Sequence, residues 1–96
     1  MDDLKVPRNT DKFEHLCHPG RVQLADGDGE GRIEHVLVRE KGRDGIRFSW
    51  WNNNLYMKNA LELPESDLLK LFQDAINNGV FSSSFREKLS LMLRHP

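Results

Sequence analysis

The sequence contains a single cysteine, Cys17, so no disulfide can form within the chain. A lone thiol is typical of proteins kept in a reducing compartment, and we therefore expect a cytoplasmic location. No stretch approaches eighteen consecutive apolar residues, so we expect no membrane-spanning helix. The opening residues, Met-Asp-Asp-Leu-Lys, lack the apolar run of a signal peptide, and we expect none.

The chain carries little net charge, but its charges are unevenly distributed. The formal total is −1 over 96 residues, of which 38% are hydrophobic and 30% are charged. Residues 1–31 carry four Lys/Arg and seven Asp/Glu, whereas residues 32–58 carry six Lys/Arg and three Asp/Glu. Length and composition indicate one ordinary globular domain, and its positive charge is concentrated in the middle of the chain.

Alternation of apolar and polar residues predicts four β-strands. Their expected ranges are 21–24, 32–40, 45–51 and 55–63. Turns rich in glycine or asparagine separate them, at residues 26–31, 41–45 and 52–54. Four short strands joined by such turns predict an antiparallel meander.

The same alternation predicts which side chains face the core. In the strand at 45–51 the apolar set is expected to point inward, because a one-residue slip would bury Arg47. The inward set is then Val36, Val38, Ile46, Phe48 and Trp50. The adjacent rings Trp50 and Trp51 must point to opposite faces of a strand, so we expect Trp50 in the core and Trp51 on the outside.

Two amphipathic helices are expected after the strands, at residues 64–78 and 83–94. Pro64 suits a first helical position and Gly79 suits a C-terminal stop. Ser84 and Glu87 fit a capping box at the start of the second helix. The predicted fold class is therefore α+β, a four-stranded antiparallel meander sheet followed by two C-terminal helices.

The N-terminal residues are expected to form an arm. Residues 20–96 are interpreted as one domain, and residues 1–19 as a partly ordered arm before it. Within the arm, Phe13, Leu16 and Cys17 would share one side of a helical turn or two, bracketed by Pro7 and by the break at 18–20.

The predicted outward face of the sheet combines cations with aromatic rings. Cations neutralise phosphates, rings stack on unpaired bases, and the planar guanidinium group of arginine can do both. This mixture favours a non-catalytic surface for single-stranded DNA or RNA. The residues expected to form it are Arg39, Lys41, Arg43, Arg47, Trp51, Tyr56 and Lys58.

The same face fits a second interpretation, in which the chain is a small regulatory or inhibitory adaptor. Trp51, Tyr56 and Leu37 would then dock on a partner protein. The near-neutral total charge favours this alternative, because many nucleic-acid binders are distinctly basic. In either case we expect a homodimer, since a single-layer sheet with two amphipathic helices has more apolar surface than 96 residues readily bury.

Neither a metal site nor a catalytic site is expected. Residues 26–33 resemble the first eight positions of a calcium loop, but the twelfth position holds Leu37 where a bidentate glutamate is needed. His15, Cys17 and His18 lack the spacing and the second ligand pair of a zinc site. The carboxylates are scattered and no glycine-rich loop opens a helix. We therefore expect no cofactor and no enzymatic activity.

The order of elements resembles a known group of nucleic-acid-binding domains. Four meandering strands lead into a helix through Leu-Glu-Leu-Pro-Glu at 61–65. This pattern, over residues 20–78, looks like the unit of Pur-type, Whirly-type and positive-cofactor-type transcriptional coactivators. The resemblance implies single-stranded DNA or RNA binding on the sheet face, dimerisation, and a role in transcription regulation or RNA handling.

Overall fold

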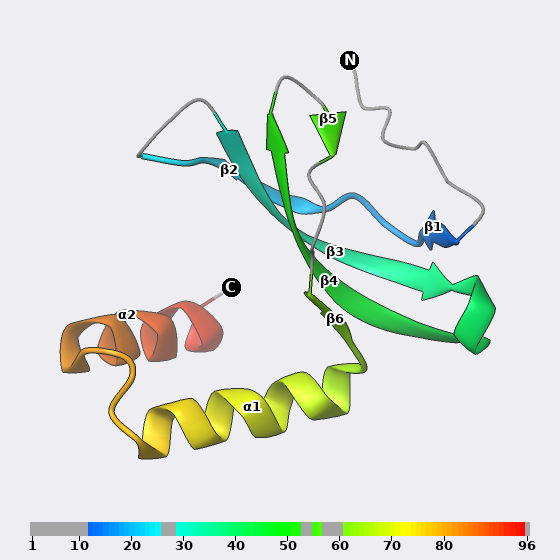
Figure 1. Ribbon diagram of the computed structural model, residues 1–96. Helices are drawn as coiled ribbons and strands as arrows, with labels where there is room; N and C mark the ends of the chain where they lie inside the picture. Colours follow the sequence, from blue (N-terminus) through cyan, green and yellow to red (C-terminus); the bar gives the residue numbers. More distant parts are fainter. Residues whose placement is uncertain (1–11, 26–28, 53–54, 57–60, 96) are drawn as a thin grey trace. The chain divides into compact units, whose positions relative to one another are not determined.

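The chain is described by a computed structural model that covers residues 12–25, 29–52, 55–56 and 61–95. An antiparallel sheet is followed by two C-terminal helices (Figure 1), which confirms the predicted α+β class. The strands are β1 (Phe13–His15), β2 (Gly20–Gln23), β3 (Gly29–Val38), β4 (Arg43–Asn52), β5 (Leu55–Tyr56) and β6 (Leu61–Leu63). The helices are α1 (Glu65–Asn77) and α2 (Ser83–Arg94), and a short 3-10 helix, Arg39–Lys41, joins β3 to β4.

The sheet has two long central strands, with two short strands along the outer side of each. β3 and β4 pair along ten residues each and form its centre. β1 and β2 both pair with the outer side of β3, at opposite ends of that strand, and β5 and β6 both pair with β4 (Figure 1). The predicted first strand at 21–24 corresponds to β2, and the predicted fourth strand at 55–63 corresponds to β5 and β6.

β1 replaces the helical turn that the sequence predicted. Phe13 pairs with Val38 and His15 pairs with Val36, so this segment is held by the end of β3. The prediction was wrong because pairing with a neighbouring strand outweighs the local helical pattern. Gly20, the first residue of β2, pairs with Ile33. Residues 16–19 therefore connect β1 to β2, and they are two more than the two residues of β3 that lie between Ile33 and Val36.

The register of β3 and β4 determines the two faces of the sheet. Glu34 lies opposite Arg47 and Val36 lies opposite Gly45. Directly opposed residues point to the same face of a sheet, so Val36 shares a face with Arg47. Ile46 shares the other face with His35. The predicted inward set, which joined Val36 and Val38 to Ile46, Phe48 and Trp50, is therefore wrong because it mixes both faces.

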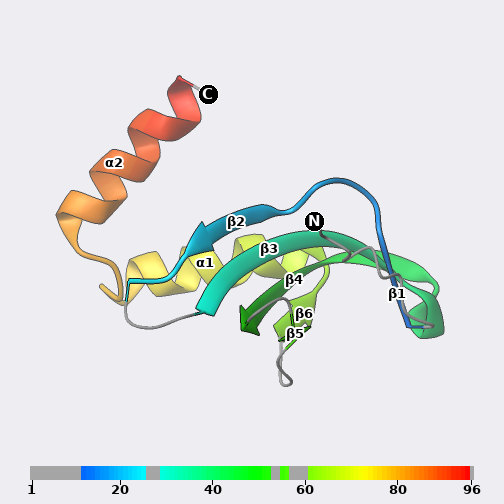
Figure 2. The same ribbon diagram turned by 90° about the horizontal axis from the view of Figure 1, so that it is seen from above.

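The better buried face is the polar one. We call polar face the side of the sheet that carries Phe13, His15, Arg21, Gln23, Glu30, Arg32, Glu34, Val36, Val38, Arg43, Arg47, Ser49, Trp51 and Glu62. The opposite side, the apolar face, carries Val22, Ile33, Leu37, Ile46, Phe48, Trp50, Leu61 and Leu63, together with the polar residues Glu14, His35 and Asp44. Trp51 is 7% exposed and Trp50 is 48% exposed, the reverse of the predicted assignment. Figure 2 shows that β3 and β4 curve strongly along their length.

The helices belong to a second compact unit, Ser66–Pro96. α1 ends at Gly79, which adopts the left-handed conformation (φ 70°), so that the amide groups of Gly79 and Val80 donate to the carbonyls of Ile76 and Ala75. This is the Schellman arrangement that favours glycine at the position. The predicted helix at 64–78 is thereby confirmed within one residue at each end.

α2 occupies the predicted range of 83–94, but its cap differs from the prediction. The hydroxyl of Ser82 accepts a hydrogen bond of 3.1 Å from the amide of Phe85. Ser82 is therefore the capping residue, and Ser84 lies inside the first turn. Phe81 packs 5.4 Å from Phe72 and 5.0 Å from Phe85 between ring centroids, which connects the two helices. Neither helix is long and apolar enough to cross a membrane, within the residues described.

Candidate nucleic-acid interface

The centre of the polar face is the carboxylate of Glu34 on β3. Arg47 donates to it through Nε (2.7 Å) and Nη2 (3.2 Å), and the Ser49 hydroxyl donates at 2.7 Å. His15 Nε2 lies 2.9 Å from the second oxygen. Ser49 Oγ in turn accepts a bond of 2.7 Å from Trp51 Nε1. Alternation places these residues on one face, so two strands and β1 supply a single connected set of side chains.

Glu34 is held in its charged form although no part of it is exposed. Burial by itself would raise the pKa of its carboxyl group, but hydrogen bonds from Arg47, His15 and Ser49 outweigh burial and lower the pKa. The carboxylate is therefore ionised at neutral pH and neutralises the buried guanidinium of Arg47. With its acceptor sites already occupied, Glu34 organises the sheet and has little capacity to bind a ligand.

A different arrangement occurs where β2 lies against β3. The guanidinium of Arg32 stacks on the Trp51 ring, with 4.0 Å between its central carbon and the ring centroid. Arg32 Nε donates to Glu30 at 2.7 Å. The terminal nitrogens of Arg32, Nη1 and Nη2, are buried and have no hydrogen-bond partner among the described residues. A charged group with two unused buried donors is a candidate for binding an anion.

Glu30 connects this arginine to a second one. Arg21 lies directly opposite Arg32 on β2, and it donates to Glu30 from both Nε and Nη2. These hydrogen bonds, the bond from Arg21 above all, lower the pKa of Glu30 despite its partial burial. One carboxylate thus bridges two guanidinium groups.

The opposite end of the polar face repeats this construction. Glu62 on β6 accepts bonds from Arg43 (2.6 and 3.1 Å) and from Lys41 (3.3 Å). The hydrogen bond from Arg43 is the main reason that the pKa of Glu62 is lowered. Here too a single carboxylate lies between two cations.

The structure separates the residues that the sequence predicted to act together. Arg47 and Trp51 are buried in the polar face, so their predicted outward exposure is wrong. Their burial follows from the register, because Glu34 lies opposite Arg47 and provides the countercharge that the prediction did not consider. Arg39 is exposed and pairs with Glu14 at 2.8 Å.

Four predicted residues remain, and the structure describes the side chains of only two of them, Lys41 and Arg43. Lys41 and Arg43 are brought together by Glu62. Tyr56 pairs with Trp51 in the β4–β5 ladder, while its side chain and all of Lys58 lie outside the described residues.

Sequence reasoning missed Arg21, Glu30 and Arg32. One signal was available, since Glu30, Arg32 and Glu34 alternate in sign on one face of the same strand. Such alternation favours a face on which charges are paired. The exposed ring of Trp50 was missed because the predicted inward set mixed the two faces of the sheet and therefore assigned Trp50 to the core and Trp51 to the outside. A Cβ atom at Gly29 would lie 2.0 Å from Trp50 Nε1, so the indole covers this glycine.

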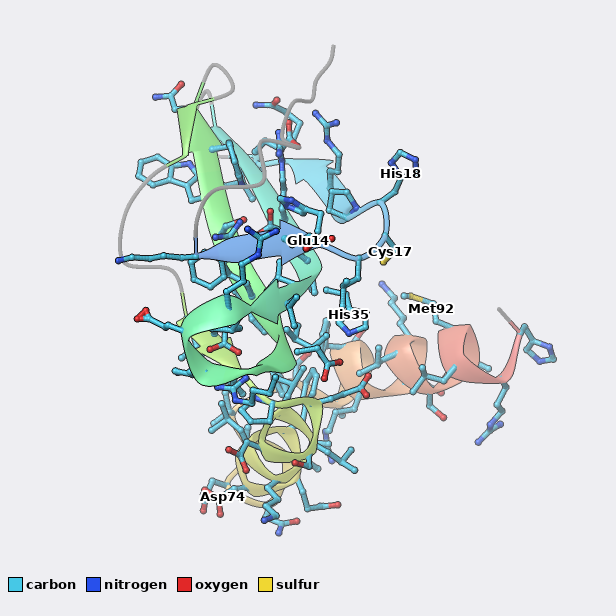
Figure 3. The ribbon with its side chains drawn as sticks, turned by 90° about the vertical axis from the view of Figure 1, so that its right-hand side faces the viewer. Glu14, Cys17, His18, His35, Asp74 and Met92 are labelled. Atoms are coloured by element: carbon cyan, nitrogen blue, oxygen red, sulfur yellow. The ribbon has the colours of Figure 1, made fainter. Side chains whose placement is uncertain are left out.

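Polar residues elsewhere form smaller groups. His35 Nε2 lies 2.6 Å from Asp44 Oδ2, in an exposed pair on the apolar face. Figure 3 shows Cys17 and His18 beside one another at the connection between β1 and β2. Throughout the described part of the chain, no three His, Cys, Asp or Glu side chains gather in a group that could hold a metal ion.

The chain matches no known family model, no curated protein and no solved structure. The functional assignment therefore depends on the geometry of the polar face.

Proposed function

We propose that this protein is a non-catalytic nucleic-acid-binding protein that prefers single-stranded DNA or RNA and binds it at the margin of the polar face, where Arg21 is exposed. The observation that carries the proposal is Arg32, which stacks on Trp51 and leaves two buried donors unpartnered. An unsatisfied buried donor costs about 1–3 kcal/mol, and more when the group is charged. A phosphate oxygen would satisfy both donors and the charge.

Exposed cations at the margins of the sheet support the same function. Arg21, Lys41 and Arg39 are all exposed, and each is held by a carboxylate at the margin of the sheet. The pair between Arg39 and Glu14 is exposed on both sides. Pairs of this kind contribute only about 0–1 kcal/mol, so a phosphate can replace this carboxylate at little cost. Binding then gains from the release of counterions.

The shape of the sheet supports the preference for single strands. β3 and β4 are strongly curved (Figure 2), and a flexible strand can follow such a surface. Duplex DNA resists bending over distances as short as this sheet, since its persistence length is about 150 base pairs.

The proposal includes a role in transcription regulation or RNA handling. The free, exposed thiol of Cys17 supports a cytoplasmic location.

Fluorescence anisotropy with labelled single-stranded and duplex oligonucleotides over a salt series tests the proposal. Wild-type protein should bind the single strand more tightly, with affinity that falls steeply as salt rises. Arg32→Gln should weaken binding about tenfold and reduce the salt slope by about one. Arg94→Gln, which removes an equal charge from the end of α2, serves as the matched control and should have little effect. Absence of binding at low salt, or tighter binding of the duplex, would contradict the proposal.

The apolar face supports a second proposal, that the protein forms a homodimer. Val22, Ile33, Trp50 and Leu61 are each about half exposed or more on this face. The described buried hydrophobic residues, Val36, Val38 and Trp51, all lie on the polar face, so the apolar face contributes little to the core of the sheet. A patch of this kind suits a second copy of the chain, because a two-fold interface joins the same surface from both subunits.

Light scattering after size exclusion tests the dimer. The wild-type protein should have the mass of two chains, and Trp50→Thr should shift it toward one. Met92→Gln, an exposed apolar side chain on α2, serves as the matched control and should leave the mass unchanged. A wild-type protein that remains monomeric at the highest concentration reached would refute the dimer.

A further inference from the structure

Arg21 and Arg32 form an unusual pair for a β-sheet. They lie directly opposite each other on β2 and β3 and point to the same face. Like charges in this position destabilise a sheet. Glu30 relieves the repulsion, because its position two residues before Arg32 places its carboxylate on the same face. The two arginines are therefore compatible only with an anion between them.

The carboxylate of Glu30 satisfies this requirement incompletely. It receives Nε and Nη2 from Arg21 but only Nε from Arg32. Nη1 and Nη2 of Arg32 stay unpartnered among the described residues, and Arg32 is only 3% exposed. A phosphodiester offers two charged, non-bridging oxygens, set tetrahedrally about phosphorus rather than in the plane of a carboxylate, and can accept bonds from both guanidinium groups at once.

We propose that Arg21 and Arg32 are the two halves of a phosphate-binding clamp, and that Glu30 occupies this clamp in the free protein as an internal competitor. A phosphodiester of the bound strand displaces the Glu30 carboxylate, which moves toward solvent, and takes its place between the arginines. The inference rests on the proposed nucleic-acid function and specifies how that function is regulated. Glu30 lowers the affinity for any phosphate and thereby favours ligands that offer several phosphates in a row.

The geometry of Trp51 is consistent with this role. Its ring lies against the Arg32 guanidinium at 4.0 Å, and its indole nitrogen is fixed by Ser49 at 2.7 Å. The clamp therefore has one rigid half, Arg32, and one exposed half, Arg21, which Glu30 alone holds among the described contacts of its guanidinium. Rigid placement of one donor group reduces the ordering cost of binding an anion.

Removing the charge of the Glu30 side chain without changing its shape tests the inference. Glu30→Gln should bind a labelled single-stranded oligonucleotide about tenfold more tightly than the wild-type protein. The matched control is Glu14→Gln, which removes the same charge from the same sheet but frees only one arginine, Arg39, in an exposed pair. It should tighten binding about twofold, the effect expected of net charge alone. Arg21→Gln removes the exposed half of the clamp and should weaken binding in a protein that retains Glu30.

A second readout uses inorganic phosphate as the probe. Phosphate, compared with chloride at equal ionic strength, should raise the thermal midpoint of Glu30→Gln more than that of Glu14→Gln. Equal gains in oligonucleotide affinity from Glu30→Gln and Glu14→Gln would overturn the clamp and leave the proposed function intact. Stabilisation of Glu30→Gln by phosphate without oligonucleotide binding would support the clamp and reject nucleic acid as the source of its phosphate. Failure of every variant to respond to either probe would overturn both.

Discussion

Replacing Glu34 by glutamine should destabilise the sheet by roughly 3–5 kcal/mol. The carboxylate is fully buried and receives three side-chain hydrogen bonds from Arg47 and Ser49. Its removal takes the carboxylate that accepts two hydrogen bonds from the guanidinium of Arg47, a group that is only 5% exposed. For a domain of this size the loss corresponds to a fall of roughly 12–40 °C in thermal midpoint.

Denaturant titration followed by tryptophan fluorescence measures this loss, because Trp50 and Trp51 both lie on β4. A double-mutant cycle separates the ion pair from general damage. Arg47→Met alone should also be costly, since it leaves Glu34 buried without its main partner. The double variant Glu34→Gln/Arg47→Met should recover roughly 2–3 kcal/mol relative to the sum of the single changes.

Glu14→Gln is the control for this cycle, because it breaks an exposed ion pair with Arg39 on the same sheet. Its cost should stay below about 1 kcal/mol. The reasoning is refuted if Glu34→Gln costs no more than Glu14→Gln, or if the two single changes at 34 and 47 are additive. Either result would mean that the polar face is not a buried, paired arrangement in solution.

Three further predictions concern pH, packing and capping. Since the pKa of Glu34 is lower in the folded protein than in the unfolded chain, its stabilisation is present above the unfolded value of about 4.3 and is lost as the pH falls through the folded value. Urea midpoints of the wild-type protein should therefore fall on acidification, and those of Glu34→Gln should fall less. Gly29→Ala should displace the Trp50 indole and change its fluorescence, with a cost of about 1–3 kcal/mol; an unchanged spectrum would contradict the close contact. Ser82→Ala should cost about 1 kcal/mol and reduce helical circular dichroism, because the amide of Phe85 loses its acceptor; Ser84→Ala is the control.

The sequence predicted the elements of this fold better than it predicted their faces. The long central strands and both helices follow from period-two and period-3.6 patterns, which are strong in β3, β4, α1 and α2. The short strand β1 has no such pattern, since three residues held by β3 carry little local signal. Its existence depends on a partner more than twenty residues away.

The assignment of faces failed because alternation within one strand says nothing about the next strand. The sequence identifies Val36 and Phe48 each as apolar positions in alternating strands, but only the register shows that they lie on opposite faces. The assumption that Arg47 must be exposed then placed Trp51 on the outside. Burial of a charge becomes acceptable when its partner is buried beside it, and Glu34 provides that partner. A search for complementary charges on adjacent strands would have found this pair.

The short strands at the edges of the sheet have a consequence for the behaviour of the protein at high concentration. Exposed strand edges are templates for polymerisation, since their free amide and carbonyl groups can pair with another chain. Here the edge segments are three and four residues long on one side, and two and three on the other. On the β1–β2 side, the connection between the two strands contains two additional residues, so β1 and β2 pair with β3 in different registers. On the β1–β2 side, neither strand offers the six or seven uninterrupted residues that seed a cross-β fibril, so the sheet can keep a large hydrophobic surface and still resist amyloid growth from this edge.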